Sequence, residues 1–227
     1  MTGIYDFLLY VPIFSELPTE TIEKIAKVGI KRTYKKESVI LLEEDAGSAL
    51  FVIIDGKVKV SRSSDDGKEV ILTILGESDF FGEMAILDGQ TRSANVIALE
   101  DTELFLIKRD DFIKLLYDHP EVSIALLQEL TTRLRQADMK IKSLTLKDAE
   151  GKVATVLLQI ADDLGKIKQG KVEIEKLPLQ QDLANMAGTS RETISRTLHA
   201  FAKKGLVEIE GSKLRITDYE KFKEMFS

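Results

Sequence analysis

Four residue types that suit a phosphorylated sugar are grouped in the stretch FGEMAILDGQTRSA, between residues 81 and 94. Gly82 lets backbone N–H groups approach a phosphate, and Arg92 can pair with phosphate oxygens through charge-assisted hydrogen bonds. Ser93 offers a hydroxyl group, and Glu83 can accept a hydrogen bond from a ribose hydroxyl. An internal Glu83–Arg92 ion pair that pins a turn explains the same pattern. On chemistry alone the stretch fits a ligand site and a structural ion pair equally well.

A second pattern lies between residues 179 and 205, LQQDLANMAGTSRETISRTLHAFAKKG. Gly188 separates two short helical patterns, and Ile194, Leu198 and Phe201 mark the inner face of the second helix by their spacing. The opposite face of that helix carries polar side chains that project together, namely Arg191, Glu192, Ser195, Arg196 and His199. Two β-rich runs, at residues 206–209 and 214–216, then predict a hairpin. Helix, turn, helix and hairpin in this order predict a winged helix-turn-helix.

The two arginines of this face suit the reading of base edges. Arg191 and Arg196 are five residues apart, about 7.5 Å along a helix axis or roughly two base-pair steps. A guanidinium group bridges guanine O6 and N7 and discriminates by about 1 to 3 kcal/mol per base. Glu192 suits a cytosine amino group, and we favour this role over a capping box with Thr189 that merely closes the helix start. A solvated helix face is the alternative for the arginines.

The segments around residues 81–94 are predicted to be short strands. Residues 38–108 alternate β-rich runs with Asp55-Gly56, Asp66-Gly67 and Asp88-Gly89, which are hairpin signals. Many short strands without a long helical pattern predict an antiparallel sandwich or barrel-like roll. Residues 15–28 predict a helix that precedes this roll.

A long helix is predicted after Pro120, because apolar residues recur there at alternating spacings of three and four. These residues are Leu127, Leu130, Leu134, Ala137, Ile141 and Leu144. We favour a dimer seam, and an amphipathic helix packed on its own domain is the alternative. With Leu127 at position a, Arg133 at g and Asp138 at the next e predict an ion pair between parallel partner helices.

Composition excludes several classes of function. The chain has 227 residues, 44% of them hydrophobic, a net charge of −6 and no cysteine. An iron–sulfur cluster, a Cys-ligated zinc and a thiolate nucleophile are therefore excluded. His119 and His199 are poorly placed for a haem or metal, and we find no P-loop, so we expect no enzyme activity. No apolar run is long enough to span a membrane, and we expect an unprocessed cytoplasmic protein.

Together these motifs resemble the cyclic AMP receptor protein/FNR (Crp/Fnr) family of bacterial transcription regulators. The resemblance covers nearly the whole chain and rests on VPIFSELPTETIEKIA, ALFVIIDGKVKV, FGEMAILDGQTRSA and TSRETISR. It implies an α+β protein with a jelly-roll-like antiparallel β-roll at residues 1–119 and a dimerisation helix at 120–147. A winged helix-turn-helix DNA-binding domain is expected at residues 148–227.

The resemblance also implies roles for single residues. Gly82, Glu83, Arg92 and Ser93 are expected to hold the ribose and cyclic phosphate of a nucleotide. Arg191, Glu192 and Arg196 match members that read TGTGA-like half-sites, so we predict a TGTGA palindrome. The predicted DNA contacts from the recognition-helix stretch are Thr189, Ser190, Arg191, Glu192, Ser195 and Arg196. The expected mechanism is a two-state homodimer on double-stranded DNA, with RNA polymerase as a further partner of an activator.

The identity of the nucleotide depends on two positions of the long helix. In the cyclic AMP receptor, two adjacent hydroxyl residues contact adenine, and the corresponding positions here are Ala137 and Asp138. A carboxylate suits the paired N–H donors of guanine, so cyclic AMP is the first expectation and a guanine nucleotide is the alternative. The Arg133–Asp138 ion pair is the rival role for Asp138. Two other functions stay open: a regulatory module that acts through a protein partner, and an effector-independent regulator of this family.

Overall fold

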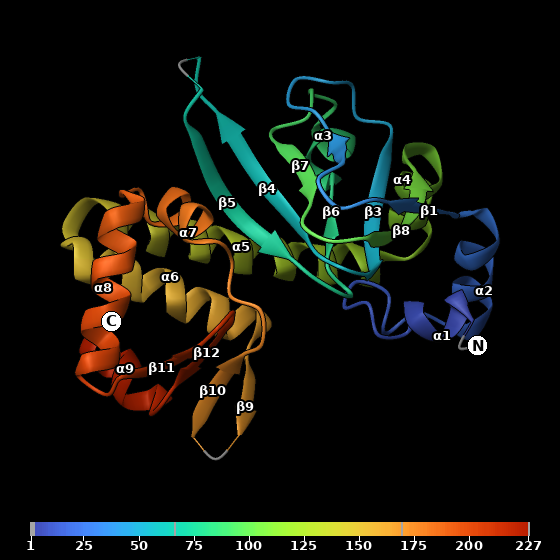
Figure 1. Ribbon diagram of the computed structural model, residues 1–227. Coiled ribbons are helices and arrows are strands. Elements are labelled where there is room, and N and C mark those ends of the chain that lie inside the picture. Colours follow the sequence, from blue (N-terminus) through green and yellow to red (C-terminus); the bar gives the residue numbers. More distant parts are fainter. Residues whose placement is uncertain (1–2, 66, 169, 227) are drawn as a thin grey trace. The chain divides into compact units, whose positions relative to one another are not determined.

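The computed structural model describes residues 3–65, 67–168 and 170–226 and divides the chain into two compact units. The first unit holds residues 1–62 and 72–135, and the second holds residues 63–71 and 136–227 (Figure 1). The first is a β-roll with helices and the second is a helix-turn-helix with a small sheet, so the predicted α+β class is confirmed. No helix of the described residues is long and apolar enough to cross a membrane.

The first unit contains two antiparallel sheets and the helices that flank them, except that the end of β4 and the start of β5 belong to the second unit. The strands join in the orders β1-β8-β3-β6 and β2-β7-β4-β5, which confirms the predicted antiparallel roll. The strands are β1 (Ile30–Tyr34), β2 (Val39–Leu41), β3 (Ala49–Asp55), β4 (Val58–Ser63), β5 (Glu69–Leu75), β6 (Phe80–Phe81), β7 (Asn95–Ala98) and β8 (Thr102–Lys108). The helices are α1 (Ile4–Leu8), α2 (Thr19–Val28), α3 (Glu83–Asp88), α4 (Arg109–Asp118) and the first part of α5 (Pro120–Leu146).

Strand β3 is buried on both faces because successive side chains point to opposite sides of a strand. Leu50 and Val52 pack into a cluster with residues of the flanking helices α1, α2, α4 and α5. Phe51 and Ile53 pack into a second cluster between the sheets, where the Phe51 and Phe81 rings are stacked with centroids 5.0 Å apart. The near-continuous apolar run of β3 therefore serves two cores, and the strand holds the backbone beside the stretch 81–94.

Two of the predicted hairpins are wrong. Asp55-Gly56 makes a turn, but β3 and β4 on either side of it belong to different sheets. Asp88-Gly89 ends helix α3 instead of joining strands, with Gly89 in the left-handed region at a φ of 73°. The hairpin between β4 and β5 does form around Gly67, while Asp66 lies outside the described residues. The helix predicted over 15–28 begins at Thr19, after Pro18.

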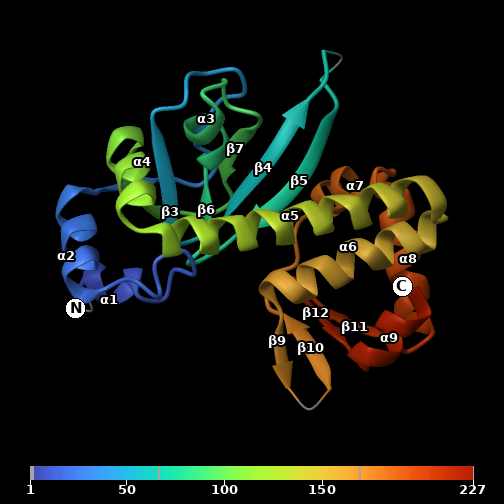
Figure 2. The same cartoon turned by 180° about the vertical axis from the view of Figure 1, so that it is seen from behind.

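The second unit confirms the predicted helix-turn-helix and the hairpin that follows it (Figure 2). Gly188 occupies the left-handed region at a φ of 58° and ends the first helix of the pair, as a C-terminal glycine does. Strands β9 and β10 were not predicted, and they extend the hairpin into a sheet of order β11-β12-β10-β9. The elements are α6 (Ala149–Leu164), β9 (Lys166–Lys168), β10 (Lys171–Ile174), α7 (Gln180–Ala187), α8 (Arg191–Lys203), β11 (Val207–Glu210), β12 (Lys213–Ile216) and α9 (Tyr219–Phe226).

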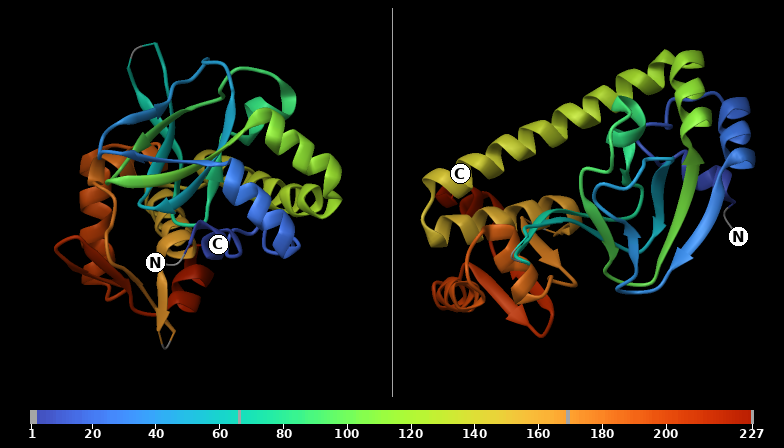
Figure 3. Two further views of the ribbon diagram at one scale, coloured as in Figure 1. Left: turned by 90° about the vertical axis from the view of Figure 1, so that its right-hand side faces the viewer. Right: turned by 90° about the horizontal axis from the view of Figure 1, so that it is seen from above.

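The predicted long helix is confirmed as α5, one continuous helix of 27 residues (Figure 3). Near its start, Val122 and Leu126 are buried in the core of the first unit. Leu127, Leu134 and Ile141, seven residues apart, are each 63% exposed. Of the predicted seam residues, Leu130 instead packs against the core of the first unit. The helix thus packs on its own domain through one set of residues and exposes the other predicted seam residues.

Candidate ligand cassette and nucleic-acid interface

Arg92, the one basic residue of the stretch 81–94, is buried, with 4% of its surface exposed. Its Nη1 donates to the Gly82 carbonyl at 2.7 Å, and its Nη2 donates to the Ala49 carbonyl at 2.9 Å. The guanidinium lies 5.7 Å from the centre of the Phe51 ring, and Nε is buried without a hydrogen-bond partner. Burial lowers the pKa of Arg92, and the charges of Glu83 and Asp45 partly oppose this effect, although no carboxylate of the described residues forms a direct ion pair with Arg92.

Gly82 is required where it stands for two independent reasons. Its φ of 84° lies in the left-handed region, which side chains with a Cβ adopt at a cost. A Cβ there would also lie 2.6 Å from Arg92 Nη1 and 3.2 Å from the Ala49 carbonyl oxygen. Only glycine therefore allows the guanidinium to lie against this backbone at the start of α3.

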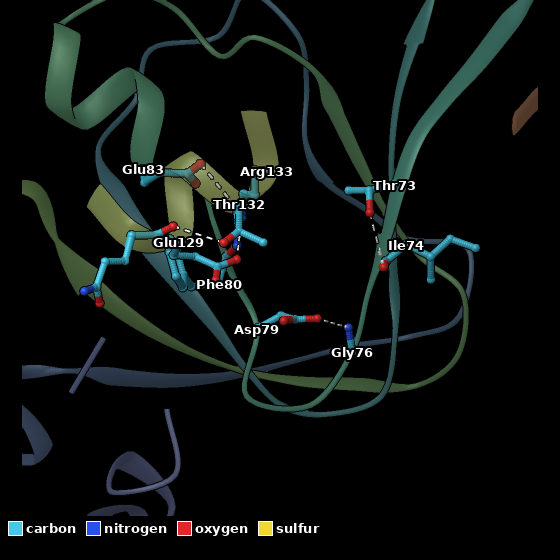
Figure 4. Close-up of polar contacts among 10 residues, drawn as sticks. Thr73, Ile74, Gly76, Asp79, Phe80, Glu83, Glu129, Thr132 and Arg133 are labelled. Atoms are coloured by element: carbon cyan, nitrogen blue, oxygen red, sulfur yellow. Dashed lines mark hydrogen bonds and ion pairs between the residues drawn. The ribbon is translucent and has the colours of Figure 1, made fainter. Parts of the chain in front are cut away.

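Glu83 pairs with Arg133 and not with Arg92, so the internal Glu83–Arg92 ion pair considered from the sequence is wrong. Arg133 Nη1 lies 3.3 Å from a Glu83 carboxylate oxygen, and its Nε donates to Glu129 at 3.0 Å. Its Nη2 donates to the Phe80 carbonyl at 2.9 Å, and the guanidinium lies over the Phe80 ring (Figure 4). Helix α5 thus fixes the carboxylate at the first residue of α3.

Burial dominates the electrostatics of Glu83, which is 5% exposed. Burial raises its pKa, and the charges of Arg133 and Arg92 only partly oppose this effect. The nearby Ser93 is exposed, and its hydroxyl lies 3.5 Å from the Met84 sulfur, a weak contact. The structure therefore brings Gly82, Arg92 and Glu83 together at the start of α3, with Ser93 free to take another hydrogen-bond partner.

The two positions expected to contact a base lie elsewhere on α5. Ala137 and Asp138 are exposed and belong to the second unit. Arg133, the predicted partner of Asp138 across a dimer, is already bonded to Glu83, Glu129 and a backbone carbonyl of its own chain. This arrangement weighs against an ion pair between Arg133 and Asp138.

The polar face of α8 forms an open hollow of about 580 Å³. Its lining residues are Gln180, Arg191, Glu192, Ser195, Arg196 and His199. The opposite face is buried, since Ile194 and Phe201 have no exposed surface. Five of the six lining residues come from α8, as the helical spacing predicts, and Gln180 comes from the first residue of α7.

Helix α8 begins one residue later than the capping-box interpretation requires, and that interpretation is wrong. The cap is Ser190, whose hydroxyl accepts a hydrogen bond from the Thr193 backbone N–H at 3.2 Å. Thr189 lies outside the helix in the turn after α7. The pKa of Glu192 is lowered because its own backbone N–H and the Ser190 hydroxyl donate to its carboxylate. Glu192 is therefore a charged acceptor on the exposed face.

Three residues of these sites were missed as site residues at the sequence level. Arg133 lies fifty residues from Glu83 in the chain, and only its heptad position set it apart. Gln180 lies on the other helix of the pair, so helical periodicity within α8 gives no signal for it. His199 was placed on the polar face but was not counted as a DNA contact, although it lines the hollow. In the described part of the chain, no His, Asp and Glu cluster is placed to hold a metal ion.

Comparison with known proteins identifies the class. Residues 31–119 match the model of a cyclic nucleotide-binding domain, and residues 151–225 match that of a Crp-like helix-turn-helix domain. These domains define a DNA-binding transcription regulator with a cyclic nucleotide-binding domain, and related proteins of this kind are regulators and not enzymes.

Relatives place the chain within this class. It is 32% identical over 216 residues to a CRP-like cAMP-activated global transcriptional regulator of Mycobacterium tuberculosis, covering 95% of this chain and 96% of that protein. It is 36% identical over 198 residues to a cyclic AMP receptor protein of Thermus thermophilus, covering 87% and 88%. The fold matches that of FixK2 from Bradyrhizobium japonicum with a TM-score of 0.78, at 23% identity and covering 88% and 98%. The chain belongs to the Crp/Fnr family of transcription regulators.

Proposed function

We propose that this regulator is a homodimer that binds a cyclic nucleotide in the cassette of Gly82, Glu83, Arg92 and Ser93 and thereby controls binding to a TGTGA palindrome. The three working parts are a ligand domain at residues 1–119, a dimerisation helix at 120–147 and a DNA-binding domain at 148–227. The nucleotide favours one of two dimer states by binding it more tightly, and the two recognition helices then match two successive major grooves.

The observation that carries the ligand proposal is the buried guanidinium of Arg92, whose Nε has no hydrogen-bond partner. A buried cation is costly unless an opposite charge and hydrogen bonds compensate it. Two carbonyl oxygens accept from Arg92, but its Nε–H has no partner, and the carboxylates of Glu83 and Asp45 act on its charge without forming a direct ion pair among the described residues. A cyclic phosphate supplies the missing anion, and Glu83, held by Arg133, is placed beside it to accept from a ribose hydroxyl. The names of the relatives from Mycobacterium tuberculosis and Thermus thermophilus support a cyclic nucleotide.

The dimer proposal rests on the exposed heptad residues of α5. Leu127, Leu134 and Ile141 expose 63% of their surface each, which is unusual for three large apolar residues on one helix stripe. Burial against the same residues of a second copy removes this apolar surface from water. Sedimentation at micromolar concentration should give a dimer, and Leu134→Glu should shift the protein toward the monomer because it places like charges at the seam.

The nucleotide is proposed to be cyclic AMP, and Asp138 is the specific observation that favours a second candidate, a guanine nucleotide. Asp138 is exposed, and Arg133 is engaged elsewhere, so its carboxylate is available to the two N–H donors of guanine. Calorimetric titration of the chain with cyclic AMP and with cyclic GMP distinguishes the two. Tight binding of cyclic AMP alone excludes the guanine candidate, whereas preference for cyclic GMP that Asp138→Asn abolishes supports it.

The DNA proposal rests on the two arginines of the exposed face. Arg191 and Arg196 are exposed and have no ion-pair partner among the described residues, so both guanidinium groups are available to guanines. Glu192 is a charged acceptor between them and suits a cytosine amino group. Fluorescence anisotropy of a labelled TGTGA-n6-TCACA duplex, with and without cyclic AMP and against a scrambled duplex, tests the function at one fixed salt concentration.

Three results of that titration are informative. Specific binding only with cyclic AMP supports the whole proposal. Specific binding without cyclic AMP keeps the DNA site and assigns the cassette to another nucleotide or to none. Equal binding of both duplexes contradicts the TGTGA proposal and favours a regulator of other specificity.

A further inference from the structure

Helix α9 is held at both of its ends within the second unit. At its start, the Tyr219 hydroxyl donates to the Asp162 carboxylate on α6, and both burial and this bond raise the pKa of Tyr219. At its end, the Phe226 backbone carbonyl accepts a hydrogen bond from the Lys147 ammonium. The helix therefore spans from the last turn of α6 to the residue that follows α5.

Between these ends, α9 packs its aromatic rings against the recognition helix α8. The Phe222 and Phe226 rings lie 5.5 Å and 5.3 Å from the Phe201 ring, measured between centroids, and 5.0 Å from each other. Phe201 is fully buried and lies on the face of α8 opposite the hollow. Aromatic contacts of this geometry add to the free energy gained from burial and hold the rings in defined orientations. The inner face of α8 therefore rests on α9.

Lys147 lies at the junction between two helices. It follows Leu146, the last residue of α5, and precedes Asp148, whose side chain caps α6 by accepting from the Gly151 backbone N–H at 2.8 Å. Besides the Phe226 carbonyl, Lys147 donates to the Thr155 hydroxyl at 3.1 Å. Burial lowers the pKa of Lys147, yet its ammonium group has two acceptors in place. The residue thus ties the α5–α6 junction to the end of α9.

A second, exposed contact links α8 to the same junction. Lys204, the residue that follows α8, pairs with Glu150 in the first turn of α6 at 2.6 Å. The recognition helix is therefore connected to the junction directly through Lys204 and indirectly through α9. Because the direct ion pair is exposed, salt and water weaken it, and the buried aromatic contact is the stronger link.

We propose that α9 is a strut that fixes the recognition helix to the α5–α6 junction, with Lys147 and Phe226 as its positioning residues. A displacement of the end of α5 then also displaces Arg191 and Arg196, because α9 connects the α5–α6 junction firmly to α8. The proposal rests on the proposed function, because it describes how the ligand state of α5 reaches the DNA-reading face.

The experiment compares full-length K147M, K147R and the exposed control K142M with the wild type. Each is titrated against the palindromic and the scrambled duplex, with and without cyclic AMP. In K147M, the loss of one hydrogen bond from a charged donor should lower two quantities by about fivefold or more. These are the preference for the palindrome over the scrambled duplex and the increase in palindrome affinity produced by cyclic AMP. K147R should recover most of both, and K142M should match the wild type. Calorimetric melting confirms that each variant is folded.

Hydrogen exchange of the amides in α8 and α9 provides a readout that does not depend on DNA or nucleotide. Exchange in both helices should quicken together in K147M and return toward the wild-type rate in K147R. Wild-type duplex preference, wild-type gain from cyclic AMP and wild-type exchange in K147M would overturn the strut. A wild-type chain that does not prefer the palindrome contradicts the proposed function instead, and the exchange comparison then decides the strut alone.

Discussion

The cassette and the recognition face use arginine in opposite ways. Arg92 is 4% exposed, touches two backbone carbonyls and lies against an aromatic ring. Arg191 and Arg196 are exposed and line an open hollow without ion-pair partners among the described residues. One region fixes its cation before any ligand arrives, and the other presents its cations to solvent.

The difference follows from the size and charge of what each region is proposed to bind. A small phosphate ester must be recognised by few groups, so those groups are desolvated and held in advance, which lowers the entropy lost on binding. DNA offers a long array of charges and base edges, so exposed, mobile arginines suffice and salt competes with them. We therefore expect salt to weaken DNA binding steeply and nucleotide binding only slightly.

The largest expected effect is loss of the buried cation. Arg92→Met should weaken nucleotide binding by about a hundredfold or more, because the anion loses its charge-assisted donors. The melting temperature without nucleotide should change little, because Met fills a similar volume and removes a buried charge, whereas the Gly82 and Ala49 carbonyls lose their donor. Calorimetric titration and melting measure both quantities, and a large fall in melting temperature with unchanged affinity would assign Arg92 a structural role only.

The next effect tests whether the cassette backbone is as closely fitted as the distances indicate. Gly82→Ala adds a Cβ in close contact with Arg92 and a backbone carbonyl, at a left-handed φ. The control Gly89→Ala has a similar φ of 73° but no heavy atom within 4 Å of the added Cβ. We expect about 1 kcal/mol of lost stability for the control, from backbone strain alone, and about 2 to 4 kcal/mol for Gly82→Ala. Equal losses in urea unfolding would contradict the close fit.

The third effect concerns the exposed arginines. Arg191→Ala should reduce binding of the palindrome about tenfold and binding of the scrambled duplex far less, with unchanged melting temperature. Arg32→Ala, an exposed arginine on β1, is the matched control and should change neither. Anisotropy with the two duplexes makes the measurement. An equal loss on both duplexes would indicate a phosphate contact instead of base reading.

The smallest expected effect tests whether burial lowers the pKa of a lysine that lies outside both proposed sites. Burial lowers the pKa of Lys140 to about 8, although its ammonium donates to the Ile71 carbonyl at 2.7 Å. Between about pH 8 and its unfolded value near 10.5, the unfolded chain binds the extra proton, so stability rises with pH in this window. Below pH 8 both states are protonated and the full cost of burying the charge is present.

Lys140→Met removes this dependence. The stability advantage of the variant over the wild type should therefore shrink by about 1 kcal/mol from pH 8 to 10.5, a figure reduced for the partial exposure of the group. Urea unfolding of both proteins across this range measures the difference. A constant difference would show that Lys140 keeps its proton as readily in the folded chain as in the unfolded one.

Local sequence signals predicted those elements whose formation depends on neighbours in the chain. The spacing of Leu127, Leu134 and Ile141 predicted α5, and Gly188 between two helical patterns predicted the helix-turn-helix. The same signals failed at Asp55-Gly56, where a turn connects two different sheets, and at Asp88-Gly89, where a helix ends. Turn residues report only the local backbone, and which strands pair depends on packing between distant segments.

The sequence by itself determined the family, the order of β-roll, long helix and winged helix-turn-helix, and the residue types of both proposed sites. The tertiary structure alone decided that Arg133 pairs with Glu83 across fifty residues, that Arg92 takes carbonyls in place of a carboxylate, and that Ser190 caps α8. Periodicity and motif spacing describe one helix or one loop at a time. Ion pairs and buried hydrogen bonds are fixed by which groups burial brings together, and burial is a property of the whole fold.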